Sequence, residues 1–125
     1  CPICNESKLE TEISKLLDDN DIEYERQKKF EWLCNIKNMS LDFYLPKYNI
    51  AIECQGEQHF RPIDYFGGKD EYDIICNRDR IKYNLCKEHD LNIFYFSTKE
   101  FGNIDYLGNI YCDKERLLEE ITRLQ

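Results

Sequence analysis

The chain lacks any long apolar run, and no stretch approaches the roughly 18 apolar residues of a membrane-spanning helix. It also lacks a leader in which basic residues precede an apolar segment. We therefore expect neither a membrane span nor a signal peptide, and an intracellular protein of the cytoplasm or nucleus. The initiator Met is missing too, since the chain begins at Cys1, and we interpret it as a piece of a longer protein.

Internal repeats and low-complexity segments are also missing. The 125 residues are enough for one hydrophobic core but not for two. Aromatic residues make up 14% of the chain, mostly Tyr and Phe in strand-like runs, which excludes a disordered tail. The composition therefore predicts a single globular domain.

The seven cysteines do not form the evenly paired framework of a secreted disulfide-linked domain, and their number and irregular spacing indicate reduced thiols. Cys1 and Cys4 form a CxxC pair, which is the spacing of one half of a zinc site. No second CxxC or Cys/His pair follows to complete four ligands. Either the partners precede Cys1, or the pair binds nothing here. We assign residues 1–6 to the remnant of an upstream zinc knuckle and residues 7–125 to the globular domain.

Basic residues are outnumbered by acidic ones, 17 to 25, and the net charge of -8 argues against a nucleic-acid-binding protein. The excess acid lies in the flanks, however, because residues 26–99 contain eleven acids and twelve bases. The charge therefore weakens a nucleic-acid-binding interpretation without excluding it.

Apolar periodicity and turn residues predict seven elements. A helix is expected over residues 7–19, with Ser7 as the N-cap and Glu10 completing a capping box. Strands are expected over 22–30, 40–45, 50–55 and 91–96, and further helices over 69–88 and from Asp113 to 124. Residues 101–111 fit a further hairpin or a loop. The order is helix, three strands, helix, strand, helix, and the helix over 69–88 suits a crossover between parallel strands.

The turn over residues 46–49 joins the strands expected over 40–45 and 50–55, and it sets the register in which they pair. If Leu45 pairs with Ile50, Asp42 lies opposite Glu53, with about 5 Å between their Cβ atoms. Two carboxylates that close repel unless a cation lies between them, and such oxygen ligands suit Mg²⁺. Gln55 falls on the same face of the strand. Side chains alternate along the second strand, so Ile50, Ile52 and Cys54 should point the other way, into a core.

These residues can perform phosphodiester hydrolysis, which needs a divalent cation and a side chain that positions water. We assign Asp42 and Glu53 to the cation and Gln55 to the water. His59 follows Gly56, where the chain can turn, and is a candidate general base. The alternative for each residue taken alone is a solvated carboxylate or a hydrogen-bonded loop histidine.

The helix over 69–88 carries further polar candidates. Asp79 and Lys82 lie three residues apart on a stripe with Ile75, so they can face the sheet. Spacing alone slightly favours the alternative of a surface ion pair worth less than about 1 kcal/mol. The neighbouring Arg78 and Arg80 suit contact with phosphate.

The runs Leu41–Pro46, Ile52–Phe60 and Arg78–Lys82 together resemble the PD-(D/E)XK nuclease superfamily. Within it, the likeness is to the very-short-patch-repair-like branch, which includes homing endonucleases of phages and large viruses with an E-D-x-H-D pattern. The resemblance covers roughly residues 7–98. It implies a restriction-endonuclease-like α/β fold, with a mixed sheet flanked by helices, and DNA cleavage that depends on Mg²⁺ or Mn²⁺.

The same resemblance implies site residues. Glu10, Asp42, His59 and Asp79 match the E, D, H and D positions, and Glu53 matches the acidic position of the (D/E)XK triplet. Relatives often carry zinc knuckles ahead of the nuclease, which agrees with Cys1 and Cys4 and with Zn²⁺ in the longer protein.

The chain departs from the family pattern at Gln55, which stands where the triplet has Lys. Since Gln carries no positive charge, His59 or Lys82 is expected to take that task.

The sequence therefore predicts a Mg²⁺-dependent endonuclease that nicks or cuts DNA. One alternative is a catalytically silent nuclease fold that binds nucleic acid, and another is a protein-interaction domain that uses the acidic flanks. DNA is the expected partner, no membrane partner is expected, and a dimer is as compatible with the sequence as a monomer.

Overall fold

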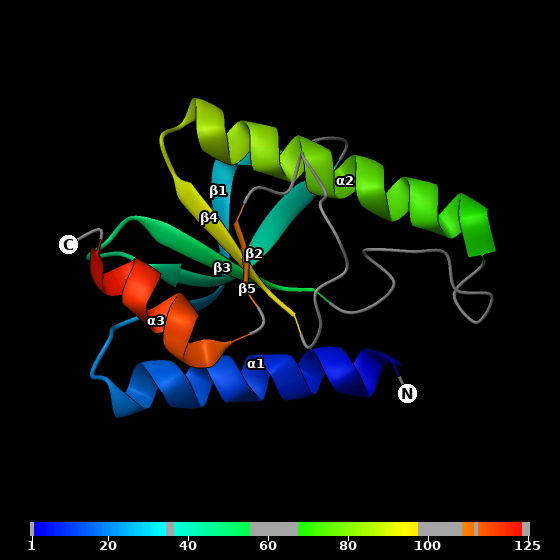
Figure 1. Ribbon diagram of the computed structural model, residues 1–125. Helices are drawn as coiled ribbons and strands as arrows, with labels where there is room; N and C mark the ends of the chain where they lie inside the picture. Colours follow the sequence, from blue (N-terminus) through cyan, green and yellow to red (C-terminus); the bar gives the residue numbers. More distant parts are fainter. Residues whose placement is uncertain (1, 35–36, 56–67, 98–108, 112, 124–125) are drawn as a thin grey trace.

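The computed structural model describes residues 2–34, 37–55, 68–97, 109–111 and 113–123. Within these residues, three helices and five strands follow one another (Figure 1). They are α1 (Pro2–Asp19), β1 (Glu25–Cys34), β2 (Asn38–Leu45), β3 (Ile50–Cys54), α2 (Gly68–Glu88), β4 (Asn92–Phe96), β5 (Asn109–Tyr111) and α3 (Lys114–Arg123). No described helix combines the length and the apolar character that crossing a membrane requires.

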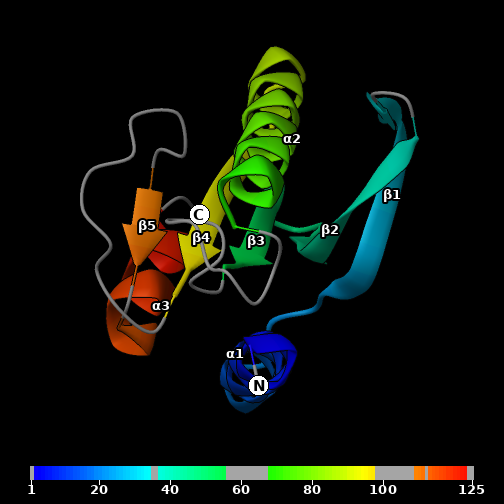
Figure 2. The ribbon, with the colours of Figure 1, turned by 90° about the vertical axis from the view of Figure 1, so that its right-hand side faces the viewer.

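The strands form one mixed sheet in the order β1-β2-β3-β4-β5. β2 pairs antiparallel with both β1 and β3, whereas β4 pairs parallel with both β3 and β5. α2 covers one face of the sheet, and α1 and α3 cover the other (Figures 1 and 2). The expected α/β class and mixed sheet are confirmed, and α2 is the predicted crossover between parallel strands.

Each face of the sheet has its own core. All five residues of β3 are buried, as expected for a central strand covered on both faces. Ile50, Ile52 and Cys54 belong to the core beneath α1 and α3, as predicted. Ala51 points the opposite way, into the core beneath α2. The alternation therefore directs Glu53 toward α2.

The hairpin of β1 and β2 bends away from β3 (Figure 2). Phe43 packs in the core beneath α1 and α3, but Leu41 packs in the core beneath α2. Two residues separated by one position share a face in a regular strand, so the strand must turn between them. At the same level of β1, Gln27 has a positive φ of 51°, between the pairs Arg26–Phe43 and Lys28–Leu41. This bend opens the space in which the polar residues meet.

The start of α1 differs from the prediction. The helix begins at Pro2, so Ser7 lies within it and is not its N-cap. Proline is well suited to the first turn of a helix, because its missing N–H has no intrahelical partner there. The capping-box role expected of Glu10 is therefore wrong.

The segment after α1 was also assigned wrongly, since β1 begins at Glu25 and not at residue 22. Asp21 adopts a left-handed conformation with φ 55°, and the Ile22 N–H donates to the Leu17 carbonyl at 2.9 Å. This is a Schellman helix end, and Ile22 and Leu17 both belong to the core beneath α1 and α3. Ile22 thus closes the helix and does not begin the strand.

The C-terminal part contains a strand that the sequence did not reveal. β5 pairs with β4 in parallel, and the remainder of the 101–111 segment lies outside the described residues. The predicted cap of α3 is confirmed, because Asp113 Oδ1 accepts the Glu115 N–H at 2.9 Å.

Candidate metal-binding active site

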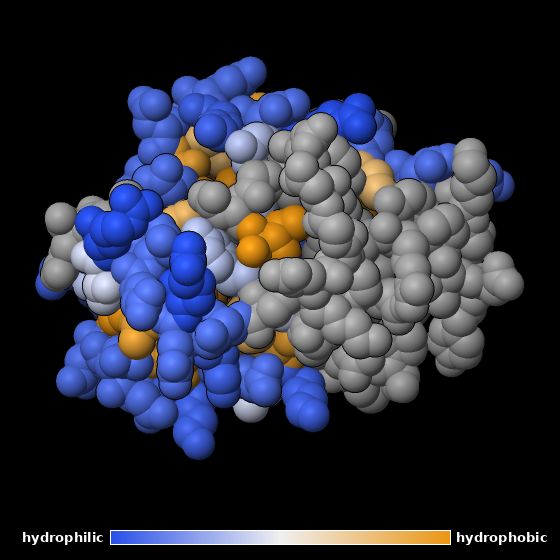
Figure 3. Space-filling view, in the orientation of Figure 1, coloured by the Kyte–Doolittle hydropathy of each residue, from blue (hydrophilic) through white to orange (hydrophobic). Residues whose placement is uncertain are grey.

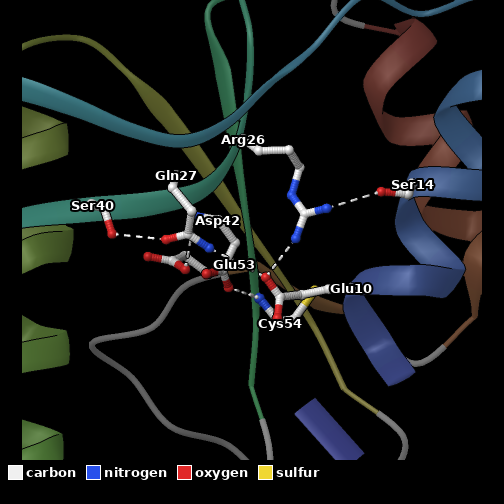
Figure 4. Close-up of polar contacts among 8 residues, drawn as sticks. All are labelled: Glu10, Ser14, Arg26, Gln27, Ser40, Asp42, Glu53 and Cys54. Carbon is white, nitrogen blue, oxygen red and sulfur yellow. Dashed lines mark hydrogen bonds and ion pairs between the residues drawn. The ribbon is translucent and has the colours of Figure 1, made fainter. Parts of the chain in front are cut away.

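Asp42 and Glu53 meet where β2 and β3 part. The pairing of Leu45 with Ile50 is as predicted, and the ladder continues as far as the pair Phe43–Ile52. Beyond it, side chains replace the backbone ladder (Figure 4). Asp42 Oδ2 accepts the Cys54 N–H at 2.9 Å, and Glu53 Oε2 accepts the Asp42 N–H at 3.4 Å. The two carboxylates therefore satisfy the amides that the parting of the strands leaves open.

The parting opens into a cleft of about 450 Å³ between the hairpin and α2. Residues 37–40 of the hairpin form one wall, and α2 forms the other through Ile75, Arg78, Asp79 and Lys82. Asp42, Glu53, Cys54 and Gln55 also line it. The cleft thus brings most of the described candidate residues together.

Burial and the proximity of the two carboxylates govern their protonation. Glu53 is only 4% exposed. Removal of Asp42 from water, followed by the negative charge of Glu53, raises the pKa of Asp42 from 3.8 to about 8. In the metal-free protein the pair therefore holds a proton at neutral pH, and a bound cation can replace it.

Lys82 reaches the carboxylates from α2. Its Nζ donates to Glu53 Oε1 at 2.6 Å and to the Ser40 carbonyl at 2.9 Å. Burial lowers the pKa of Lys82, but the charges of Glu53, Asp42 and Asp79 raise it more, and the net shift is upward. Lys82 is thus a charged ammonium in the cleft, and the surface ion pair that spacing slightly favoured is wrong.

The other α2 candidates lie on different sides of the helix. Asp79 is 4% exposed and lines the cleft, and Arg78 is exposed at the cleft wall. Arg80 is exposed and is not one of the residues lining the cleft. On the same helix, Ile74 is 59% exposed, whereas its neighbour Ile75 is buried, as its predicted place on the stripe facing the sheet requires.

Gln55 follows β3 on the face of Glu53 and lines the cleft. It is 3% exposed, and its Oε1 is buried without a hydrogen-bond partner among the residues that the structure describes. Buried polar atoms in native proteins almost always have a partner. An unsatisfied acceptor at this position suits a water molecule or a cation.

Glu10 belongs to a polar network between α1 and the hairpin (Figure 4). Its Oε1 accepts hydrogen bonds from Arg26 Nη2 at 2.9 Å and from Gln27 Nε2 at 3.3 Å. Gln27 Oε1 in turn accepts from Ser40 Oγ at 3.0 Å. The sequence did not predict that Arg26, Gln27 and Ser40 belong to this network. The alternation of side chains along β1 reveals neither the bend at Gln27 nor the position of α1 opposite the strand.

Three predicted site residues, one catalytic and two zinc ligands, are not placed. His59 and Cys1 lie outside the described residues, and the structure describes no side chain for Cys4. A role for His59 near the carboxylates and a zinc knuckle at the N-terminus stay predictions.

The donor set fits one Mg²⁺ or Mn²⁺ ion. Within the described residues, no group of three or more His, Cys, Asp or Glu side chains is arranged to hold a metal. Two carboxylates are nevertheless a common protein contribution for Mg²⁺, which keeps several water ligands. Asp42 and Glu53 could supply those carboxylates. Gln55 Oε1, which has no hydrogen-bond partner within the described part of the chain, could accept a hydrogen bond from a water ligand.

Comparisons with models of known protein families, with curated proteins and with solved structures find no match to this chain.

Proposed function

We propose that the protein is a metal-dependent DNA endonuclease that hydrolyses phosphodiester bonds, with a restriction-endonuclease-like fold of the PD-(D/E)XK superfamily. The observation that carries the proposal is the meeting of Asp42 and Glu53 at the parting of two strands, beside the Lys82 ammonium in an open cleft. The mixed sheet with α2 as crossover supports the proposed fold.

Asp42 and Glu53 are the proposed metal ligands, and Asp42 releases its proton when the ion binds. A bound Mg²⁺ or Mn²⁺ ion would polarise the phosphate and lower the pKa of a water molecule. Gln55 accepts a hydrogen bond from water through Oε1 and thereby orients it. This assignment gives a function to the unsatisfied oxygen of Gln55.

Lys82 takes the place of the lysine that the family triplet has where this chain has Gln55. Its ammonium lies 2.6 Å from Glu53 Oε1, which puts a positive charge directly beside the proposed metal ligands. There it can stabilise the negative charge that develops on the phosphate oxygens. This position supports Lys82 for the task, whereas His59 has no described position.

Two exposed basic residues flank the cleft entrance on opposite walls. Lys37 comes from the hairpin, and Arg78 comes from α2. Both can contact phosphates on either side of the bond to be cut, which would hold the backbone across the carboxylates. DNA is the proposed partner for this reason.

The second candidate function is a catalytically silent nuclease fold that binds nucleic acid. The observation that favours it is the same 2.6 Å ion pair, because the Lys82 ammonium already neutralises a carboxylate that a metal would use. Against it stands Asp42, a second carboxyl group beside that ion pair. Its removal from water, followed by the charge of Glu53, raises its pKa to about 8, so Asp42 holds a proton that a cation can replace.

A plasmid-nicking assay separates the two functions. The wild type should convert supercoiled plasmid in Mg²⁺ or Mn²⁺ but not in EDTA, and Asp42→Asn and Glu53→Gln should each lose at least about a hundredfold in rate. Asp19→Asn, at the exposed end of α1, is the matched control and should cut normally. Salt-sensitive DNA binding by the wild type without cleavage in either metal would contradict the enzyme and support the silent module.

A further inference from the structure

Gln27 has a backbone conformation that is unusual for its residue type. Among the described non-glycine residues, positive φ angles occur at Asp21, Gln27, Asn49 and Asp90. The other three are Asp or Asn in turns, which tolerate the left-handed region best. Gln27 is the third residue of β1, where neither its residue type nor a turn favours that conformation. Unfavourable backbone geometry of this kind is concentrated at functional sites.

The carboxamide of Gln27 bridges two elements. Its Nε2 donates to Glu10 Oε1 on α1 at 3.3 Å, and its Oε1 accepts from Ser40 Oγ on β2 at 3.0 Å. Figure 4 shows Gln27 between these two partners. Both polar atoms of the carboxamide therefore form hydrogen bonds, which fixes the orientation of the side chain.

The contacts of Gln27 continue into the cleft through Ser40. The Ser40 carbonyl accepts from Lys82 Nζ at 2.9 Å, and the same Nζ donates to Glu53 at 2.6 Å. One connected set of contacts thus runs from Glu10 through Gln27, Ser40 and Lys82 to Glu53. Its members come from α1, β1, β2, α2 and β3. Ser40, Lys82 and Glu53 line the cleft, and Glu10 and Gln27 lie behind them.

We propose that Gln27 is a positioning residue, which ties Glu10 to Ser40 and thereby sets where the Ser40 carbonyl holds Lys82 against Glu53. The inference rests on the proposed endonuclease function, and it assigns to Gln27 no contact with DNA or metal. The left-handed backbone of Gln27 is retained because it directs the carboxamide between Glu10 and Ser40. A regular β conformation would turn this side chain elsewhere.

The variant Gln27→Gly tests this role, because glycine accepts a positive φ and keeps the bend while removing the carboxamide. We expect kcat for plasmid nicking to fall on the order of tenfold, as for a misplaced catalytic group, with KM for DNA changed less than about twofold. The melting temperature should stay close to that of the wild type. Asp21→Gly, at a positive φ in an exposed turn, is the matched control and should leave kcat unchanged. A wild-type kcat in Gln27→Gly would overturn the inference.

A second measurement is independent of cleavage. In ¹H–¹⁵N spectra of lysine ammonium groups, the Lys82 signal should shift in Gln27→Gly and stay in place in Asp21→Gly. If the wild type cuts no DNA in Mg²⁺ or Mn²⁺, the proposed function fails. The Lys82 signal then tests by itself whether Gln27 sets the position of Lys82. An unshifted signal in Gln27→Gly then refutes it.

Discussion

Asp42 keeps its proton to an unusually high pH in the metal-free protein, because it is removed from water and faces Glu53. The proton and a divalent cation therefore compete for the same oxygens. Metal binding should release the proton, and the apparent affinity should depend on pH.

We predict that the affinity for Mn²⁺, measured by calorimetry, rises between pH 6 and pH 8 by up to about tenfold per pH unit. The rise should level off near the pKa of Asp42, which is about 8. Calorimetry in buffers of different ionisation enthalpy should detect up to one released proton at pH 7. An affinity that is constant over this range would contradict a shared site for proton and metal.

The same proton affects stability. The folded pKa of about 8 lies above the ordinary value of 3.8, so the folded state binds more protons than the unfolded state between these values. The contribution of Asp42 is fully present below about pH 4 and is lost as the pH rises through 8. Asp42→Asn never ionises, so it should raise the unfolding free energy at pH 8 by up to about 5 kcal/mol and by little near pH 4.

Urea unfolding in EDTA at pH 4 and pH 8 measures this difference. The Asp19→Asn variant is the control, since its carboxyl group is exposed at the end of α1. If Asp42→Asn changed the unfolding free energy by the same amount at both pH values, the pKa of Asp42 would not be raised in the folded protein.

At the scale of elements, the sequence was most informative where local chemistry decides the structure. The turn after Leu45 set the hairpin register, the spacing of α2 set its bounds nearly to the residue, and Asp113 marked the start of α3. These features depend on residues that are neighbours in the sequence. They can therefore be predicted without knowledge of the fold.

The features that were missed either give a weak local signal or depend on contacts between distant segments. The left-handed Asp21 turns Ile22 back onto α1, and β5 has only three residues, too few to show a period. The bend at Gln27 is stabilised from α1, through Glu10. For the same reason the site was predicted in its carboxylates but not in the network that surrounds them.

Asp113→Ala should lower the unfolding free energy by about 1 kcal/mol, because the Glu115 N–H loses its acceptor. Glu119→Ala, exposed on the same helix, should have a much smaller effect. Thermal unfolding of both variants at one pH makes the comparison. Equal effects would show that the hydrogen bond seen at Asp113 does not stabilise α3.

At the scale of the whole molecule, the excess of acidic residues in the helices lies in α1. α1 carries five acidic and two basic residues, whereas α2 and α3 each carry equal numbers of the two. α1 lies on the face of the sheet opposite α2 (Figure 1). Hydrophilic side chains cover much of the described surface on the side shown in Figure 3. The basic residues Lys37 and Arg78 instead flank the cleft. The net charge of -8 therefore says little about the surface that would face DNA.

Lys37→Gln and Arg78→Gln should each weaken duplex binding several-fold and reduce the slope of log Kd against log salt concentration by about 1. Lys15→Gln, exposed on α1, should change neither quantity. Fluorescence anisotropy of labelled DNA in Ca²⁺ over a salt series measures both. Unchanged slopes in the two cleft variants would place the DNA elsewhere on the molecule.

The whole account depends on one divalent ion shared by two carboxylates. Anomalous diffraction from crystals soaked in Mn²⁺ locates such an ion directly. We predict a peak at about 2.1 Å from oxygens of both Asp42 and Glu53, the distance typical of octahedral Mg²⁺ sites. Anomalous density elsewhere, with Lys82 still paired to Glu53 and no ion between the carboxylates, would contradict the account.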